Sequence, residues 1–105
     1  MQLHGKIGLI TGGTRGIGAA AALALAREGA DVALVGRSED DDARQTRAAI
    51  QAFGRRCEII LADCAKPADC TRAVAETAQR LGGIDVLIHS AGGPVNGGLL
   101  ELTPE

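Results

Sequence analysis

Eight residues, Thr11 to Gly18, read TGGTRGIG and hold four glycines. They lie directly after the apolar run Ile7 to Ile10 and directly before the alanine-rich residues 19–26. A strand that ends in such a turn and enters a helix presents free backbone N–H groups and the positive helix end to whatever lies over the turn. Glycines there remove the Cβ atoms that would keep an anion such as a pyrophosphate at a distance. The stretch predicts an anion-binding turn, and a glycine turn that merely connects two elements is the alternative.

The rest of the chain alternates short apolar runs with helical patterns and contains no repeat, linker or low-complexity segment. The predicted strands are Lys6–Ile10, Val32–Val35, Cys57–Leu61 and Val86–His89. The predicted helices are Ile17–Glu28, a helix that Ser38 caps and that runs to Phe53, and a helix that Pro67 opens and Gly82-Gly83 ends. Apolar strands that alternate with helices indicate a sheet covered on both faces. We expect an α/β fold of the Rossmann type, a doubly wound parallel sheet truncated after about four strands in the order 3-2-1-4.

Two of the predicted helices carry an apolar stripe that indicates which side faces the sheet. Ser38 with Asp41 three residues later resembles a capping box at the start of the second helix. The expected inner face of this helix is Ala43, Thr46, Ile50 and Phe53. The expected inner face of the third helix is Cys70, Ala73, Val74, Thr77, Ala78 and Leu81.

The composition excludes several classes of function. A chain of 105 residues with a net charge of −2 suits one domain with a modest core. The 11 Lys and Arg residues are dispersed among 13 Asp and Glu residues, so no basic stripe is available for a nucleic acid. No stretch approaches the roughly 20 apolar residues that span a bilayer. The cysteines Cys57, Cys64 and Cys70 form no metal or disulfide pattern and indicate buried thiols, so we expect a cytoplasmic protein with no metal, membrane or nucleic-acid partner.

The spacing Gly-x-x-x-Gly-x-Gly after Thr11 resembles the cofactor signature of the short-chain dehydrogenase/reductase family. Three further segments agree in order and distance: VGRS at the end of the second strand, LADC after the third and HSAGG after the fourth. The resemblance implies that Gly12, Gly16 and Gly18 line the pyrophosphate of a dinucleotide and that Asp63 binds the adenine amino group. It also implies that Ala91 and Gly92 approach the adenosine ribose. The full set of expected cofactor-binding residues is Thr11, Gly12, Thr14, Arg15, Gly16, Ile17, Gly18, Arg37, Ser38, Asp63, Cys64, Ser90, Ala91 and Gly92.

Some of these residues have a simpler interpretation. Asp63 is a candidate cap for the turn before Pro67, and Arg15 and Arg37 are candidates for ordinary surface charges. The family usually has Asn-Asn-Ala-Gly where this chain has His89-Ser90-Ala91-Gly92, which removes the Asn side chains that brace the strand. We interpret His89 as a core or strand-end residue and not as a ligand or a proton relay.

The choice of cofactor depends on the end of the second strand. Dinucleotide-binding units that prefer NAD usually carry an acidic residue about 20 residues after the glycines, where its carboxylate binds the ribose hydroxyls. This chain has Gly36 there, followed by Arg37 and Ser38, which can bind a 2′-phosphate. Arg15 is expected to reach the same phosphate, and Asp31 to lie at the opposite end of the strand. The sequence therefore predicts NADP, with NAD as the alternative.

The resemblance also indicates what these 105 residues do not contain. Members of the family use a catalytic Ser and a Tyr-x-x-x-Lys pair downstream of the HSAGG segment, whereas this chain has no tyrosine. Thr103-Pro104-Glu105 reads as the start of a helix. We therefore expect residues 1–105 to form the single cofactor-binding portion of an NADP-dependent oxidoreductase without its catalytic half, so that none of these residues is catalytic and the parent protein is a homo-oligomer. The alternatives are a non-catalytic dinucleotide-binding module and a truncated product without function.

Overall fold

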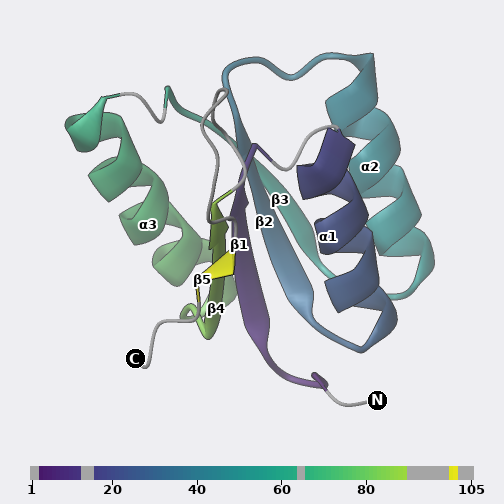
Figure 1. Cartoon of the computed structure of the whole chain (residues 1–105). Helices are drawn as coiled ribbons and strands as arrows, with labels where there is room; N and C mark the ends of the chain where they lie inside the picture. Colours follow the sequence, from purple (N-terminus) through teal and green to yellow (C-terminus); the bar gives the residue numbers. More distant parts are fainter. Residues whose placement is uncertain (1–2, 13–15, 64–65, 90–99, 102–105) are drawn as a thin grey trace.

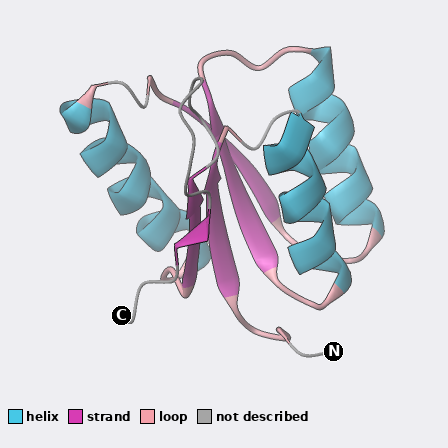
Figure 2. Ribbon diagram, viewed as in Figure 1, coloured by secondary structure: helices cyan, strands magenta, loops and turns pink. Residues whose placement is uncertain are grey.

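The computed structural model describes residues 3–12, 16–63, 66–89 and 100–101 of the chain. Their elements follow in the order β1 (Ile7–Thr11), α1 (Gly16–Arg27), β2 (Asp31–Gly36), α2 (Asp41–Ala52), β3 (Cys57–Leu61), α3 (Pro67–Leu81), β4 (Val86–His89) and β5 (Leu100–Glu101). One sheet runs through the molecule, with α1 and α2 on one face and α3 on the other (Figure 1; Figure 2). The predicted alternation of strands and helices is confirmed.

The sheet has the strand order β3-β2-β1-β4-β5. The first four of these strands are parallel, so the predicted fold class and the order 3-2-1-4 are confirmed. The short strand β5 adds to the free edge of β4 and runs antiparallel to it, which pairs Leu87 with Glu101 and Ile88 with Leu100. Two residues carry no strand pattern of their own, and the sequence did not predict this pairing.

Alternate side chains of the strands form two separate cores. Ile10, Leu34 and Ile88 pack with Ala22 and Ile50 on the face that α1 and α2 cover. The residues that alternate with these along the strands point to the other face. There Leu9, Val35 and Ile60 pack with Ala73 and Leu81 of α3. The central strands β1 and β2 therefore bury both of their faces, as expected for a parallel sheet between helices.

Several predicted boundaries were wrong by one or two residues, in β1, α1, β2 and α2. β1 runs from Ile7 to Thr11, and Thr11 extends the ladder because it lies in register with Val35 on one side and His89 on the other. The N-cap of α2 is Asp40 and not Ser38: Asp40 Oδ1 accepts a hydrogen bond from the Ala43 backbone N–H at 3.0 Å. A carboxylate at this position also complements the positive end of the helix.

The buried faces of α2 and α3 contain fewer residues than the apolar stripes predicted from the sequence. Ala43, Thr46 and Ile50 are buried in α2, but Phe53 is 44% exposed because the helix has ended at Ala52 and Phe53 is its C-cap. In α3 the buried residues are Ala73, Thr77 and Leu81, which recur every fourth position. Val74 lies beside this line, is 43% exposed, and was wrongly predicted to be buried. Cys70 is half-buried and Ala78 is exposed, so α3 contacts the sheet along a single row.

Cys57 is buried at the start of β3, in agreement with the interpretation of its thiol as part of the core. Burial raises the pKa of this thiol from 9.0 to about 12. Because only the thiolate reacts, we expect iodoacetamide at pH 8 to label Cys57 at least about tenfold more slowly than the half-buried Cys70 in the folded protein. Peptide mass spectrometry measures both rates, and unfolding in urea should make them similar. Equal labelling of the two thiols in the folded protein would contradict the burial of Cys57.

The raised pKa of Cys57 also makes the stability of the fold depend on pH. The folded state keeps its proton in the range from pH 9 to about 12, in which the unfolded chain loses it. The contribution of this thiol to stability is therefore fully present below pH 9 and is lost as the pH rises toward 12.

Candidate functional site

The carboxyl ends of β1, β2, β3 and β4 meet at one edge of the sheet, which we call the carboxyl edge. Thr11 lies in register with Val35 of β2 and with His89 of β4, and Gly36 lies in register with Leu61 of β3. The residues that follow these strands are therefore neighbours, although they are far apart in the sequence. In open α/β sheets, ligands bind outside this edge, near the strand at which the chain reverses its direction of winding. Here that strand is β1, with β2 on one side and β4 on the other.

The glycine turn leaves β1 at this edge. Gly12 has φ +73° and its backbone N–H donates a hydrogen bond to the Val35 carbonyl at 2.7 Å, which ties the start of the turn to β2. Gly16 has φ +65°, and a Cβ built on it meets no atom within 4 Å. A side chain at Gly16 would therefore be strained and would fill open space beside the turn. The structure thus has a backbone surface here that a ligand can approach closely.

The first turn of α1 adds a positive partial charge at the same place. This turn contains no acidic residue, whereas α2 begins with Asp41 and Asp42 and the first turn of α3 contains Asp69. The helix dipole of α1 is therefore not offset by a carboxylate within the helix itself. Gly18 is buried in α1, and the side chain of Ile17 is 69% exposed. This helix end suits an anion that lies over the glycine turn.

Gly8 shows that not every glycine near this site serves a ligand. A Cβ on Gly8 would lie 2.8 Å from Leu25 Cδ1 of α1. The glycine leaves room for the Leu25 side chain, through which α1 packs against β1. The sequence did not single out this position.

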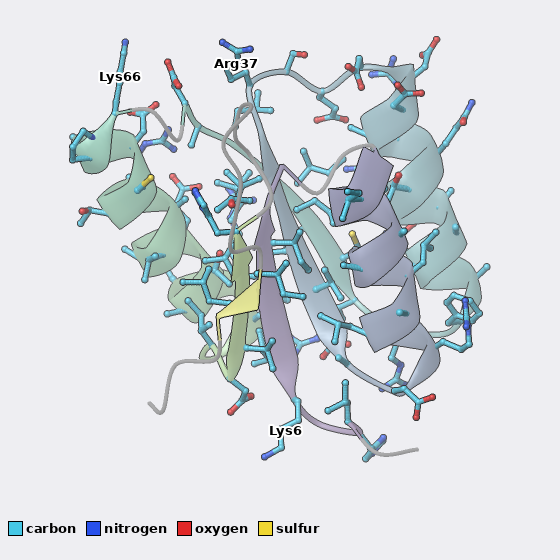
Figure 3. The ribbon with its side chains drawn as sticks, viewed as in Figure 1. Lys6, Arg37 and Lys66 are labelled. Atoms are coloured by element: carbon cyan, nitrogen blue, oxygen red, sulfur yellow. The ribbon has the colours of Figure 1, made fainter. Side chains whose placement is uncertain are left out.

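The basic side chains with no ion-pair partner among the described residues include Lys6, Arg37 and Lys66. Figure 3 shows Arg37 and Lys66 projecting from the carboxyl edge and Lys6 at the opposite end of the sheet. Arg37 and Ser38 are exposed and directly follow Gly36, whose carbonyl accepts a hydrogen bond from Ala62 N–H at 2.9 Å. The end of β2 thus offers a guanidinium and a hydroxyl to a ligand, with no acidic residue at position 36. Asp31 is at the other end of β2, as predicted, and pairs with Arg56 at 2.9 Å.

Asp63 lies in the turn between β3 and α3 and is half-buried. Its backbone N–H donates to Asp69 Oδ2 at 2.7 Å, and its carbonyl accepts from Lys66 N–H at 2.9 Å. The N-cap residue of α3 is Lys66, whose side chain makes no capping hydrogen bond. Asp63 is therefore held in place through its backbone, with Asp69 fixing the turn.

His89 links the two central strands at the carboxyl edge. Its Nδ1 lies 2.7 Å from Thr11 Oγ1 and shares a hydrogen bond with it, and the Thr11 hydroxyl also reaches the Ile88 carbonyl at 3.5 Å. The interpretation of His89 as a strand-end residue agrees with this position at the end of β4. The contact joins the ends of β1 and β4 at a position where the family usually has Asn. Sequence reasoning missed this pairing because it depends on the register of β1 and β4.

We expect His89→Ala to lower the free energy of unfolding by about 1 kcal/mol, since the hydrogen bond between Thr11 and His89 is lost. Chemical unfolding followed by circular dichroism measures this change. The matched control is His4→Ala, which removes the other histidine from an exposed turn and should leave stability unchanged. Equal effects of the two substitutions would contradict a structural role for the His89 contact.

Six of the predicted cofactor-binding residues lie outside the described part of the chain: Thr14, Arg15, Cys64, Ser90, Ala91 and Gly92. The others, which are Thr11, Gly12, Gly16, Ile17, Gly18, Arg37, Ser38 and Asp63, all lie at the carboxyl edge. Within the described ranges, no group of three or more His, Cys, Asp or Glu residues is arranged to hold a metal ion. None of the helices in those ranges is long and apolar enough to cross a membrane.

Comparison with known proteins identifies relatives of this arrangement. The family model described as short chain dehydrogenase matches residues 6–105. General stress protein 39 of Bacillus subtilis (strain 168) is 43% identical over 91 residues, which cover 87% of this chain and 32% of that protein. The chain thus spans about a third of the length of the curated relatives it matches.

Solved structures agree with the family match. A short chain dehydrogenase from Burkholderia cenocepacia J2315 in complex with NADP is 44% identical and superposes with a TM-score of 0.86, over 99% of this chain and 42% of that one. An NADH-dependent reductase complexed with NAD is 43% identical, with a TM-score of 0.80, over 87% of this chain and 38% of that one. The glycine turn, the strand order and these matches agree, and the chain belongs to the short-chain dehydrogenase/reductase family.

Proposed function

We propose that the carboxyl edge binds a nicotinamide dinucleotide with its pyrophosphate over the glycine turn. Gly12, Gly16 and Gly18 would hold the pyrophosphate, and the open space beside Gly16 together with the uncompensated end of α1 supports this position. Asp63 would bind the adenine amino group. Ala91 and Gly92 would approach the adenosine ribose, as the family resemblance implies.

The preferred cofactor in this proposal is NADP, with NAD as the alternative. Gly36 leaves room for a 2′-phosphate where a carboxylate would repel it, and Arg37 and Ser38 are exposed beside that position. Arg15 is proposed as a second cation for this phosphate on sequence grounds. The single observation that carries the proposal is the Arg37 guanidinium, which projects at the carboxyl edge with no ion-pair partner among the described residues (Figure 3).

The proposed reaction of the whole protein is hydride transfer between NADPH and a carbonyl compound or an alcohol. The cofactor supplies the hydride, and these residues supply binding and orientation of the dinucleotide. The family resemblance assigns proton transfer to a Tyr-x-x-x-Lys pair, and these 105 residues contain no tyrosine. We therefore expect the 105-residue chain by itself to bind the cofactor without reducing carbonyl compounds. A non-catalytic dinucleotide-binding module is the second candidate.

Isothermal titration calorimetry of the chain with NADP and with NAD tests the proposal. We expect both dinucleotides to bind and NADP to bind more tightly. Tighter binding of NAD would overturn the cofactor choice, and the absence of binding to either dinucleotide would overturn the proposed site.

A further inference from the structure

The loop between β2 and α2 carries Arg37 and is followed by four consecutive acidic residues, Glu39 to Asp42. Such a cluster beside a phosphate site is unfavourable, because carboxylates repel a phosphate and compete for the arginine that binds it. The way in which the structure holds these carboxylates therefore bears on the choice of cofactor. The inference below rests on the proposed binding of a dinucleotide at the carboxyl edge.

Three of these four acidic side chains, those of Glu39, Asp40 and Asp41, are bound by groups of α2. Asp40 Oδ1 caps the helix at the Ala43 backbone N–H, and Asp41 Oδ1 pairs with Arg44 Nη2 at 2.8 Å. This ion pair raises the pKa of the Arg44 guanidinium. Glu39, the acidic residue nearest to Arg37 in the sequence, pairs through Oε2 with Arg47 Nη2 at 3.3 Å.

The backbone of the loop is held by the same helix. Arg44 Nη1 donates a hydrogen bond to the Glu39 carbonyl at 2.9 Å, so one guanidinium contacts both Asp41 and the loop. Arg44 and Arg47 lie one turn apart on α2, and they bind the backbone and the side chain of Glu39 respectively. Glu39 is therefore directed toward α2.

The consequence appears at Arg37, which is exposed and pairs with no carboxylate among the described residues, although Glu39 is two positions away. We infer that Arg47 is a positioning residue for cofactor specificity. It binds the Glu39 carboxylate to α2 and so leaves the Arg37 guanidinium available for the 2′-phosphate of NADP. Arg44 supports it by fixing the carbonyl of the same residue.

Removal of the Arg47 side chain is expected to change the preference between NADP and NAD more than the stability of the fold. An exposed ion pair contributes little to folding, and the Arg47 and Glu39 side chains are 32% and 37% exposed. A released Glu39 carboxylate would pair with Arg37 or approach the 2′-phosphate, and each of these weakens NADP binding. A carboxylate near the ribose also accepts hydrogen bonds from the hydroxyls of NAD. Removal of Arg47 should therefore shift the ratio of NADP to NAD affinity toward NAD by roughly fivefold to tenfold.

Calorimetry of Arg47→Gln with NADP and NAD tests this inference, with folding of each variant checked by circular dichroism. The matched control is Arg80→Gln on α3. It breaks comparable exposed ion pairs, with Glu58 of β3 at 3.1 Å and with Glu76 of α3 at 3.6 Å, and should leave the ratio of NADP to NAD affinity unchanged. The double variant Glu39→Gln/Arg47→Gln should restore the wild-type ratio, because the released side chain no longer carries a charge. A role of Arg47 in stability alone would not give this reversal.

The single variant Glu39→Gln gives a test that does not depend on the folding of Arg47→Gln. Its ratio should stay within about twofold of the wild-type ratio, because Arg47 already neutralises the carboxylate. Any of three results would overturn the inference. The first is a large gain in NADP affinity in Glu39→Gln, and the second is an unchanged ratio of NADP to NAD affinity in Arg47→Gln. The third is a shift of this ratio in Arg47→Gln that the double variant does not reverse. A wild-type protein that binds neither dinucleotide would overturn the proposed function as well, which separates the two failures.

Discussion

Gly16→Val is expected to lower the affinity for NADP and for NAD alike by at least about tenfold, or roughly 1.4 kcal/mol. Gly16 has φ +65°, a conformation that a β-branched residue adopts only with strain. The new side chain would project into the open space beside the turn, where we propose that the pyrophosphate lies. Both dinucleotides carry this pyrophosphate, so both should lose affinity. Calorimetry measures the two dissociation constants.

A matched glycine separates backbone strain from contact with the ligand. Gly54 has φ +82° and open space around its Cβ position, but it follows α2 at the end of the sheet opposite to the carboxyl edge. Gly54→Val should therefore reduce stability in the same way and leave dinucleotide affinity unchanged. Equal losses of affinity in the two variants, or wild-type affinity in Gly16→Val, would contradict the assignment of the pyrophosphate to the glycine turn.

Arg37→Ala is expected to weaken NADP binding selectively. A charge-assisted contact to a phosphate contributes about 1.5–3 kcal/mol, and the lower end applies here because Arg37 is exposed to water. The expected loss is therefore roughly tenfold for NADP, with little change for NAD, which lacks the 2′-phosphate. Calorimetry with both cofactors gives the change in their ratio. Equal losses for both would overturn the role of Arg37 as the 2′-phosphate ligand.

Lys6 and Lys66, which have no ion-pair partner among the described residues, provide controls for the change in net charge. Lys6→Ala removes one positive charge at the opposite end of the sheet and should leave both affinities unchanged (Figure 3). Lys66→Ala removes one at the carboxyl edge, where a general electrostatic effect would lower the affinity for both cofactors at low salt. Only Arg37→Ala should change the ratio, because only its guanidinium is placed beside Gly36. A change of ratio in Lys66→Ala would assign the 2′-phosphate to the turn before α3.

The strands and helices were predictable because local signals agreed, and the strand order was predicted from the way in which right-handed crossovers wind a Rossmann-type sheet. Each parallel strand is a short apolar run that ends near a polar or glycine residue, and each helix begins and ends at turn residues. The glycine spacing also indicated the edge at which a ligand would lie. The signals for the strands, helices and glycine turn depend on residues within a few positions of one another.

Features set by distant residues could not be predicted in this way. Thr11 extends β1 because it has partners on both neighbouring strands, and its hydrogen bond to His89 joins residues 78 positions apart. Ser38 and Asp40 are both good caps, and the structure selects Asp40 where Arg44 and Arg47 hold the preceding loop. The role of Gly8 depends likewise on the position of Leu25 in α1.

The most direct measurement is a titration of the ¹⁵N-labelled protein with NADP, followed by the chemical shifts of its backbone amides. We predict the largest changes at Gly12, Gly16 and Arg37, on the carboxyl edge. The amides of Gly54 and Gly82, in the turns at the opposite end of the sheet, should not shift. Unchanged amides at the carboxyl edge, or larger shifts at Gly54 and Gly82, would contradict binding of the dinucleotide at the glycine turn.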